Sequence, residues 1–451
     1  MSPKTVFVCQ ECGYESPKWM GQCICGQWNT MVEERPMKVK KSKAAGGGGE
    51  KSKPIPIQDV QSEHYHRMDT GIGELNRVLG GGLVRGSVVL ISGEPGIGKS
   101  TLILQVAAAI ANKDHGVLYV TGEESEEQIK LRADRIHAVS NKLMLFCETN
   151  IENILVAIEN LEPDFLIVDS IQTVYSDEIT SAPGTISQVR DCTNQIIRMA
   201  KTRNIPVFII AHVTKSGELA GPRTMEHMVD AVLHFTGERN HEIRILRSYK
   251  NRYGTTSEIG AFEMNENGLS EFDNLSQSFL EGLDGVNEGS IATAVFEGSR
   301  AILLEVQALA VPANVGFARR TSIGIDASRL NMIIAVLEKK TGISLINYDI
   351  YINIVGGIKP EGTATDLAVA IAIYSSYKNI KLPSNRMIAF GEIGLTGELR
   401  PVQNAEKMIH ESLRMGFDKI ILPHKNYLKL KVDKDKIHGV TSIVEALRMI
   451  K

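Results

Sequence analysis

Apolar residues form short runs along the central part of the chain, and helical patterns separate these runs. The apolar runs have the length of strands and lie at Ser87–Ile91, Val117–Val120, Phe165–Val168 and Val207–Ile210. Helical spacing of apolar residues follows at about Lys99–Ala111, Glu126–His137, Ile151–Leu161 and Ile186–Arg203. Strands without a polar face are typical of a sheet that is buried on both sides. The pattern predicts an α/β domain with a mostly parallel sheet between two layers of helices.

The pattern changes on both sides of this region. Residues 1–36 are rich in cysteine, and residues 37–56 contain six lysines and four consecutive glycines, as a flexible linker would. After about residue 275, short strands alternate with two strongly helical stretches, Asp326–Lys340 and Thr365–Tyr374. We therefore expect a cysteine module (1–36), a linker (37–56), a large α/β domain (57–275) and a smaller α/β domain (276–451).

Composition narrows the class of protein. The chain has 451 residues, of which 43% are hydrophobic and 23% charged, as in soluble globular proteins. No apolar run approaches the length of a membrane span, and the N-terminus lacks the apolar core of a signal peptide. We expect a cytoplasmic protein without a membrane partner. The net charge of −3 means that nucleic acid would have to bind to local basic patches.

A phosphate-binding loop is the strongest chemical signal in the sequence. Gly93-Glu94-Pro95-Gly96-Ile97-Gly98-Lys99-Ser100 follows an apolar strand and opens a helix. Such a loop needs glycines so that backbone N–H groups can approach phosphate oxygens, a lysine for the β/γ charge and a hydroxyl for Mg²⁺. Lys99 and Ser100 meet these needs, with Thr101 in support, and the helix N-terminus favours an anion. The sequence therefore predicts binding and hydrolysis of ATP.

Carboxylates follow the neighbouring apolar strands. Asp169 ends the run Phe165–Val168, where a phosphate-loop enzyme places the acid that holds the metal through water. Glu123 and Glu124 come directly after another strand, so at least one is expected beside the γ-phosphate to orient or deprotonate water. The alternative is that both are solvated carboxylates at the start of a helix.

These residues, in this order, resemble the RecA/DnaB class of ATPases. The whole chain resembles the bacterial RadA (Sms) family of DNA repair and recombination proteins, which differs from the archaeal recombinase of the same name. The resemblance rests on the cysteine-rich N-terminus, the phosphate loop, a Lon-protease-like C-terminal unit and Lys250-Asn251-Arg252-Tyr253-Gly254, in which Tyr253 replaces the usual Phe.

The resemblance implies a motor that acts on DNA. The family is similar to replicative helicases, which form hexameric rings that use ATP to move along single-stranded DNA, here promoting branch migration of branched DNA. A RecA-type recombinase is the expected partner. By this analogy Glu123 aligns with the catalytic glutamate, and His212 stands where such ATPases place a γ-phosphate sensor. A histidine satisfied within the core is the other reading of His212.

Two segments without regular periodicity are candidates for DNA contacts. They are Tyr175–Ser187 and Lys215–Thr224, and in a RecA-like ring they would line the central channel. Lys215 and Arg223 supply positive charge there, and Arg190 lies nearby in sequence. Loops that bind no ligand remain the alternative.

The signature motif would act at a subunit boundary in the family's ring. Lys250 and Arg252 would point toward the neighbouring subunit, where a cation supplied in trans stabilises charge on the transferring phosphate. The motif could also contact DNA, and the sequence does not separate these two roles.

The cysteine module resembles a zinc site with four thiolates. Cys9 and Cys12 have the standard spacing, but Cys23 and Cys25 are separated by one residue where the family pattern has two. This shortened half leaves open whether Cys25 is a full ligand of Zn²⁺. Trp19 and Trp28 are expected to be packing residues rather than platforms for stacked bases.

The C-terminal unit resembles a Lon protease domain at Gly391–Arg400 and Pro360–Gly362. A Lon site needs a serine activated by a lysine. The segment Thr363–Val369 contains no serine, Asp366 is the expected occupant, and the lysine position falls near Glu406, with Lys407 adjacent. We expect an inactive assembly scaffold, with Arg319, Arg320, Arg329 and Lys359 available as a DNA-binding surface. An ATP-dependent protease and a KaiC-type ATP switch are the alternative functions.

Overall fold

The computed structural model describes most of the chain. The described residues are 6–9, 14–34, 56, 67–212, 223–237, 243–272, 275–283, 285, 287–313, 318–355, 360, 362–431 and 434–450. The chain divides into two compact units, Met1–Glu271 and Phe272–Lys451. Among the described helices, none is both long and apolar enough to cross a membrane.

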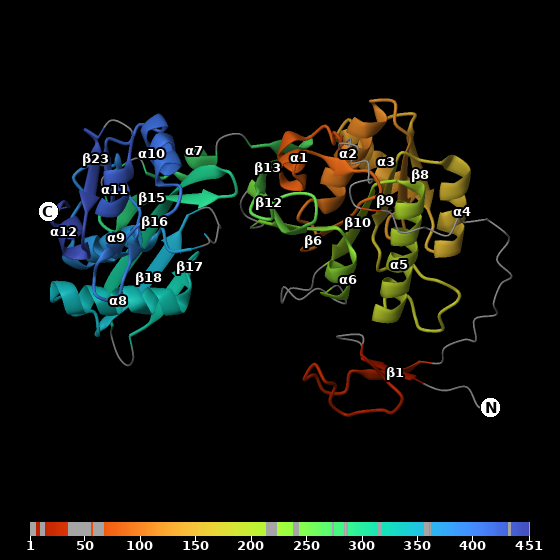
Figure 1. Cartoon of the computed structure of the whole chain (residues 1–451), viewed down its shortest axis with the longest axis horizontal. Helices are drawn as coiled ribbons and strands as arrows, with labels where there is room; N and C mark the ends of the chain where they lie inside the picture. Colours follow the sequence, from red (N-terminus) through yellow and green to blue (C-terminus); the bar gives the residue numbers. More distant parts are fainter. Residues whose placement is uncertain are drawn as a thin grey trace. The chain divides into compact units, whose positions relative to one another are not determined.

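A small antiparallel sheet forms the N-terminal module (red in Figure 1). Its strands are β1 (Val6–Cys9), β2 (Glu15–Ser16) and β3 (Met31–Glu34), in the order β2-β1-β3. The core of this module consists of Cys9, Cys23 and Met31, against which Phe7 and Met20 pack. So small a core buries little apolar surface, a situation in which a bound metal contributes free energy to folding.

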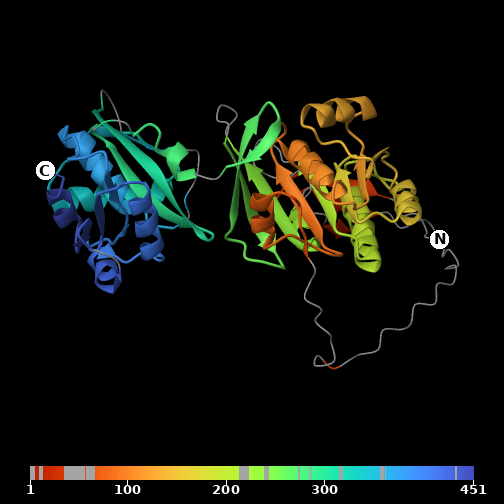
Figure 2. The ribbon, with the colours of Figure 1, turned by 90° about the horizontal axis from the view of Figure 1, so that it is seen from above.

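A nine-stranded sheet runs through the first unit (Figures 1 and 2). Its order is β14-β13-β12-β11-β6-β10-β9-β7-β8. The strands are β6 (Val88–Gly93), β7 (Val117–Thr121), β8 (Leu143–Cys147), β9 (Phe165–Asp169), β10 (Val207–His212), β11 (Ala231–Thr236), β12 (Ile243–Asn251), β13 (Ile259–Asn265) and β14 (Gly268–Glu271). A further short pair, β4 (Arg67–Met68) and β5 (Leu83–Val84), is antiparallel.

The part of the sheet from β11 to β8 is parallel, whereas β12, β13 and β14 are antiparallel. β6, β7 and β9 are buried along their whole lengths, which confirms the interpretation of the uninterrupted apolar runs. Because parallel strands end at the same edge of a sheet, the carboxyl ends of β6, β7, β9 and β10 lie at one edge.

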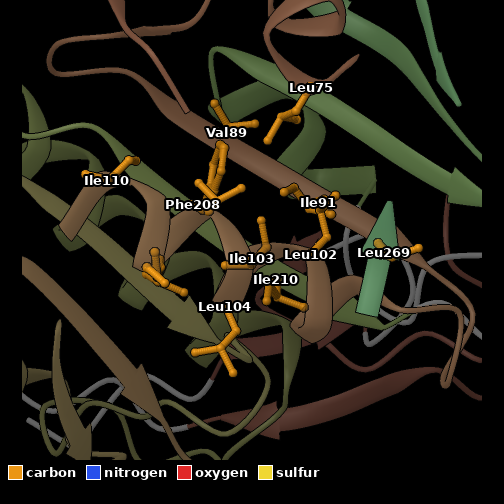
Figure 3. Packing of buried hydrophobic residues seen from close by; sticks show 14 of the residues in the cluster. Leu75, Val89, Ile91, Leu102, Ile103, Leu104, Ile110, Phe208, Ile210 and Leu269 are labelled. Atoms are coloured by element: carbon orange, nitrogen blue, oxygen red, sulfur yellow. The ribbon is translucent and has the colours of Figure 1, made fainter. Parts of the chain in front are cut away.

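Helices cover both faces of this sheet. They are α1 (Gly73–Leu79), α2 (Lys99–Ala111), α3 (Glu126–Arg135), α4 (Ile151–Leu161), α5 (Ile186–Arg203) and α6 (Arg223–Met228). One core joins α2 to the sheet and contains Leu102, Val89 and Phe208 (Figure 3). The core on the other face contains Leu90 of β6 and Ile196 of α5. Val89 and Leu90 enter opposite cores because successive side chains of a strand point to opposite faces.

Local sequence signals explain where several helices begin. Ser125 and Gln128 form a reciprocal capping box at the start of α3. The side chain of Asn150 accepts a hydrogen bond from the Asn153 backbone N–H at the start of α4, at 3.1 Å. Each cap satisfies backbone N–H groups that the first helical turn leaves without partners, which stabilises the helix by about 1 kcal/mol.

The second unit is a separate α/β layer structure with a seven-stranded sheet in the order β17-β18-β16-β15-β19-β22-β23. Its strands are β15 (Ser290–Glu297), β16 (Arg300–Pro312), β17 (Arg320–Ile323), β18 (Tyr348–Ile354), β19 (Met387–Ala389), β22 (Lys419–Pro423) and β23 (Ile437–Val440), with β20 (Glu392–Ile393) and β21 (Leu399–Arg400) as a separate pair. Its helices are α7 (Leu275–Phe279), α8 (Ala327–Thr341), α9 (Asp366–Lys378), α10 (Ala405–Arg414), α11 (His424–Lys429) and α12 (Ile443–Arg448).

The two long helices of this unit match the helical stretches expected from the sequence, with different ends. α8 begins after Asp326, whose side chain accepts hydrogen bonds from the backbone N–H groups of Ser328 and Arg329. α9 continues to Lys378, beyond the expected end at Tyr374, and stops where Asn379 adopts a left-handed backbone with φ of 52°. Asparagine tolerates this conformation better than most residues, so it ends the helix here.

Candidate functional site

The phosphate-binding loop joins β6 to α2 at the carboxyl edge of the parallel strands. Gly98 stands directly before α2 with φ of 113°, a left-handed value that glycine adopts without steric cost. A Cβ at Gly98 would lie 2.6 Å from Cε of Met264, whereas a Cβ at Gly96 would meet no atom within 4 Å. The loop is therefore packed at its base and open at Gly96, where a phosphate chain can approach the backbone N–H groups.

Lys99 is the first residue of α2 and points back into this loop. Its Nζ donates hydrogen bonds to the carbonyl oxygens of Gly93 and Glu94, at 2.8 and 2.9 Å. Burial lowers the pKa of Lys99 to about 8, and the nearby carboxylates of Asp169 and Glu123 act in the opposite direction. The lysine predicted to meet the phosphates thus lies among the acids predicted to work with it.

Asp169 ends β9 beside the phosphate loop and is 7% exposed. The hydroxyl of Tyr119 on the adjacent β7 donates a hydrogen bond to Asp169 Oδ2 at 2.6 Å. Burial, reinforced by the charge of Asp169, raises the pKa of Tyr119 well above its ordinary value, so the phenol stays a donor. Tyr119 therefore orients the carboxylate that is predicted to hold the metal.

The two glutamates after β7 have different partners. Ser170 Oγ donates a hydrogen bond to Glu123 Oε1, and Ser170 directly follows Asp169. Glu124 instead forms an ion pair with Arg132 of α3. The structure thus places Glu123 beside the end of β9 and ties Glu124 to a neighbouring helix.

His234 is a further polar residue close to the loop. It lies on β11 in register with Ser92, and Nδ1 of its ring is 2.9 Å from Ser92 Oγ. Burial lowers the pKa of His234, and the charge of Lys99 lowers it further. A neutral histidine therefore adjoins the strand that carries the phosphate loop.

The predicted sensor and DNA-binding residues are described only in part. His212 ends β10 in register with Gly93, so its backbone lies beside the start of the phosphate loop. The His212 and Arg223 side chains and the whole of Lys215 lie outside the described residues. Arg190 is exposed on α5, near the start of the helix.

The first of the two candidate DNA loops is held by Gln188 of α5. Its side-chain amide donates hydrogen bonds to the carbonyl oxygens of Ser176, Ile179 and Ser181, at 3.2, 3.1 and 2.9 Å. Its Oε1 accepts a hydrogen bond from the Ser176 backbone N–H at 2.9 Å, and the side chain is 1% exposed. Gln188 therefore fixes the path of the loop that follows β9.

Lys250 lies toward the opposite end of the strands from the phosphate loop. It pairs with Val232 of β11, which pairs with Leu90 of β6. Leu90 precedes Gly93 by three residues, or about 10 Å along the strand. Lys250 Nζ donates hydrogen bonds to the carbonyl oxygens of Glu226 and His227 in α6, at 2.8 and 3.1 Å. These contacts direct it away from the phosphate loop of its own subunit.

Arg252 lies at the same edge and forms an ion pair with a buried carboxylate. Its Nη1 donates a hydrogen bond to Asp230 Oδ1 at 3.0 Å, and Asp230 is 2% exposed. The Val88 backbone N–H also donates to Asp230, at 3.1 Å, and Lys201 Nζ lies 3.7 Å from it. Arg252 therefore has a structural function in the isolated chain, whatever it does in an assembly.

The remaining residues of the motif Lys250–Gly254 contact the end of α1. Asn251 Nδ2 contacts the carbonyl oxygens of Val78 and Leu79, at 3.3 and 3.2 Å, and its Oδ1 accepts a hydrogen bond from the Tyr253 backbone N–H. A Cβ on Gly254 would lie 3.1 Å from Cα of Gly80. A larger residue at position 254 would therefore push the motif away from the end of α1.

The cysteine sulfurs of the N-terminal module lie close together, as the predicted zinc site requires. One ligand atom each of Cys9, Cys23 and Cys25 lies within 4.8 Å of the others, and Sγ of Cys9 is 3.9 Å from Sγ of Cys25. Thiolates bound tetrahedrally to zinc at about 2.3 Å lie about 3.8 Å apart, so the spacing fits this metal. Cys25 joins the cluster despite the shortened spacing, and Cys12 lies outside the described residues.

The two tryptophans of this module are not packing residues. Their side chains are 55% exposed at Trp19 and 67% exposed at Trp28. The expectation that they are packing residues was therefore wrong. The core of the module is complete without them, because the buried cysteine sulfurs and Met31 fill it.

Asp366 occupies the position in the second unit where the resemblance places a nucleophile. It is 1% exposed at the start of α9, and Nε of Arg329 donates to its Oδ1 at 3.1 Å. A second guanidinium nitrogen contacts Oδ2, which also accepts the Ile393 backbone N–H. Burial raises the pKa of Asp366, and the contact with Arg329 acts against this rise.

Part of the basic surface expected in this unit is engaged internally. Arg329 pairs with Asp366, and Arg320 donates to the carbonyl oxygens of Leu345 and Tyr348. Lys359 lies outside the described residues, and Arg319 is exposed. A separate cavity of 430 Å³ has a lining that the sequence did not suggest: Leu275, Ser276, Ser299, Arg300, Ala301, Ile302, Lys407, His410, Glu411 and Arg414.

Comparison with known proteins accounts for all three parts of the chain. Residues 7–33 match a family described as "Rubredoxin metal binding domain", residues 52–218 an "AAA domain", and residues 315–426 "Subunit ChlI of Mg-chelatase". The chain is 51% identical over 451 residues to "DNA repair protein RadA" of Streptococcus pyogenes serotype M6, covering 99% of both chains. It is 49% identical to the protein of the same description from Bacillus subtilis, covering 99% of this chain and 98% of that one.

The chain belongs to the RadA family. This confirms the predicted fold class: a RecA-like phosphate-loop ATPase core, an N-terminal cysteine module for zinc and a Lon-protease-like C-terminal α/β domain. Among solved structures, a KaiC-like protein from Pyrococcus horikoshii is similar to 46% of this chain and 100% of its own, with a TM-score of 0.39 and 18% identity.

Several residues that lie at the site in the structure were not predicted from the sequence. Tyr119 and Gln188 are polar groups within otherwise apolar patterns, a signal that predicts a specific hydrogen-bond partner. Ser170 directly follows a predicted site residue and could have been found in the same way. His234 carried no comparable signal, because its link to Ser92 depends on strand pairing.

Proposed function

We propose that this RadA protein is a DNA-dependent ATPase that moves along single-stranded DNA and drives branch migration of recombination intermediates in DNA repair. It would work as a DNA helicase, as a homo-oligomeric ring of six subunits, together with a RecA-type recombinase. The proposed domains are the zinc module (1–36), the linker (37–56), the ATPase domain (57–275) and the Lon-like domain (276–451). The observation that carries the proposal is the separation of Lys250 from its own phosphate loop: it is level with Leu90 of β6, three residues before Gly93, and its Nζ is bound to carbonyl oxygens of α6.

Each residue at the carboxyl edge has a defined task in ATP hydrolysis. The backbone N–H groups of the loop and Lys99 bind the β- and γ-phosphates. Ser100 and Asp169 would hold Mg²⁺, which neutralises charge on the phosphates when bound. Glu123, steadied by Ser170, accepts the proton of the attacking water. His212 stands at the end of β10, where a contact with the γ-phosphate can report hydrolysis to the loop that follows.

Charge on the transferring phosphate needs a further cation, and among the described residues Lys99 is the cation whose contacts lie in the phosphate loop. Lys250 and Arg252 are bound to α6 and to Asp230, away from their own phosphate loop, so they act on ATP bound by an adjacent subunit. To do so, Lys250 must exchange its two carbonyl partners in α6 for phosphate oxygens. This exchange would make its position depend on nucleotide.

The segments that follow the parallel strands at the carboxyl edge are proposed to bind DNA. Lys215 and Arg223 follow β10 in the sequence, and Arg190 is exposed on α5 after the loop fixed by Gln188. Cations on such loops bind the phosphate backbone without regard to base sequence. Because the same edge carries the phosphate loop, hydrolysis can alter the grip on DNA.

The Lon-like domain is proposed to be proteolytically inactive. Asp366 is bound by Arg329 and the Ile393 backbone N–H, so it is neither exposed nor a suitable nucleophile. Lys407, on α10, lies over the ring of Phe296 at 5.0 Å. The domain then serves as an assembly scaffold.

The decisive experiment measures ATP hydrolysis with and without single-stranded DNA. Wild type should be stimulated, and Lys250→Ala should lose at least roughly a hundredfold of the stimulated rate while still binding ATP. Lys250→Arg, which keeps the charge, should retain part of it. Lack of stimulation in wild type would favour a KaiC-type switch, and ATP-dependent casein cleavage would favour a protease.

A mixing experiment tests action between subunits. Lys99→Ala cannot bind ATP productively but keeps Lys250, whereas Lys250→Ala keeps the phosphate loop. Mixed assemblies should hydrolyse ATP although neither variant does so alone. If mixed assemblies form and remain inactive, Lys250 does not act in trans.

A further inference from the structure

The zinc module carries a pair of exposed aromatic rings. A Cβ built on Gly21 would lie 3.6 Å from Cη2 of Trp19 and 3.9 Å from Cζ3 of Trp28. Both indoles therefore border the space above Gly21, where a side chain is lacking. They are 55% and 67% exposed, although the burial of such rings is favourable in water. Two large rings left exposed side by side indicate a binding surface.

The backbone beneath the rings is fixed. Gln22 and Trp28 form an antiparallel bridge, and the Asn29 N–H donates to the Gly21 carbonyl at 2.8 Å. The Cys23 N–H donates to the Gln27 carbonyl at 2.9 Å, which ties the same turn to a sulfur of the metal cluster. The spacing of the indoles is thus set by the fold of the zinc module before any ligand binds.

One exposed cation adjoins the rings in the sequence. Lys18, next to Trp19, is exposed; Ser16 Oγ donates a hydrogen bond to its carbonyl oxygen at 2.7 Å and accepts one from its backbone N–H at 3.2 Å. Farther along the chain, residues 37–56 contain six lysines and one glutamate. Positive charge beside exposed aromatic rings is the combination that binds single-stranded nucleic acid, with phosphates on the cations and bases on the rings.

We propose that Trp19 and Trp28 form a stacking platform for unpaired bases of single-stranded DNA, with Lys18 meeting an adjacent phosphate. Stacking on an indole requires an unpaired π-face rather than a particular base, so the platform is insensitive to sequence. This inference rests on the proposed DNA function and adds a second contact, separate from the loops of the ATPase domain. It gives the zinc module a ligand of its own.

The chain offers a direct measurement, because Trp19 and Trp28 are its two tryptophans. Tryptophan fluorescence of the full-length, zinc-loaded protein therefore reports only this module. An oligodeoxythymidylate should quench this fluorescence with the same concentration dependence as binding measured by anisotropy of the labelled strand. An abasic strand of equal length, which offers phosphates without bases, should produce much less quenching.

Variants of the two tryptophans distinguish loss of base stacking from loss of the fold of the module. Trp28→Ala and Trp19→Ala should each weaken binding of the oligonucleotide roughly five- to a hundredfold, whereas Trp28→Phe should retain most of the affinity. Zinc content equal to wild type establishes that each variant keeps its module folded. Because the wild-type titration needs no variant, misfolding of a variant does not remove the test.

The outcomes distinguish this inference from the proposed function. Binding of the strand without quenching, and with unchanged affinity in both alanine variants, would overturn the platform and leave the motor proposal intact. Absence of any binding of single-stranded DNA would overturn both. Equal quenching by the abasic strand would show that bases are not stacked, and would also count against the platform.

Discussion

At the scale of single residues, the different contacts of two adjacent glutamates predict which of them takes part in ATP hydrolysis. Glu123 accepts a hydrogen bond from Ser170, whereas Glu124 pairs with Arg132. We expect Glu123→Gln to reduce the rate of ATP hydrolysis at least roughly a hundredfold, because the amide cannot take up the proton of water. Nucleotide binding should be retained, as measured with a fluorescent ATP analogue.

Glu124→Gln is the matched control, since it changes the neighbouring carboxylate in the same way. It should keep hydrolysis within a few-fold of wild type and lower stability by at most about 1 kcal/mol, as for a partly exposed ion pair. A larger kinetic loss in Glu124→Gln than in Glu123→Gln would reverse the assignment.

The lowered pKa of Lys99 predicts that the affinity for ATP depends on pH. Its pKa of about 8 in the folded chain lies below the ordinary value of 10.5, so its charge destabilises the nucleotide-free fold below about pH 8. This destabilisation disappears as the pH rises through the range between the two values. Phosphates favour the charged lysine, so ATP binding above about pH 8 must take up a proton. The dissociation constant should then rise about tenfold per pH unit.

Calorimetric titrations from about pH 7 to pH 9 would measure this dependence. Lys99→Arg provides the control, because its guanidinium stays charged and its affinity should not follow the same slope. A flat profile in wild type would contradict the assignment of a lowered pKa to Lys99.

Arg252 and Lys250 should differ in their effects on stability. Arg252→Ala removes a partner of the buried Asp230 and should lower the free energy of unfolding by about 1–3 kcal/mol. Lys250→Ala removes hydrogen bonds at a partly exposed site and should cost about 1 kcal/mol or less. Urea denaturation of both variants would compare them, and the opposite order would mean that Asp230 does not depend on Arg252.

Some residues of the site could be predicted from the sequence, and others could not. Phosphate-loop residues follow from local chemistry, because glycines, a lysine and a hydroxyl must be contiguous. The distinction between Glu123 and Glu124 did not follow, since it depends on a serine 47 positions away that strand pairing brings close. The exposure of Trp19 and Trp28 was also hidden, because the composition of a short module does not reveal which apolar residues fill its core.

At the scale of elements, the signature strand has two functions that its sequence does not separate. Asn251 and Gly254 dock on the end of α1, while Lys250 and Arg252 carry charge at the strand's end. Helices and parallel strands could be read from periodicity, as the agreement at α2 and α5 illustrates. The antiparallel extension from β12 to β14 could not, because its pairing is set by contacts across the sheet.

Asn251→Ala tests the docking function. Loss of its contacts with the carbonyl oxygens of Val78 and Leu79 should lower the free energy of unfolding by about 1–2 kcal/mol. The change should also reduce DNA-stimulated hydrolysis by displacing Lys250. Asn265→Ala, in an exposed turn, serves as control for substitution of an asparagine in the same domain. Unchanged stability and rate in Asn251→Ala would mean that α1 does not position the motif.

At the scale of the whole molecule, the parts of the chain should respond separately to loss of metal. The zinc module has a very small core, so removal of zinc with a chelator should unfold it and change tryptophan fluorescence. The ATPase domain has its own two cores and should keep its thermal transition in the presence of ATP. Loss of that transition on chelation would show that the domain depends on the module.

The separation of Lys250 from its own phosphate loop has a consequence for symmetry. A two-fold dimer presents the same patch from both copies, so it does not readily complete two sites whose halves lie on different parts of the surface. Under the proposed action of Lys250 in trans, assembly would instead be head-to-tail, with each copy giving a cation at one side and receiving one at the other. Such a series either closes on itself or grows as a filament. In an open series the copy at one end has an incomplete site, so closure is what makes every site equivalent.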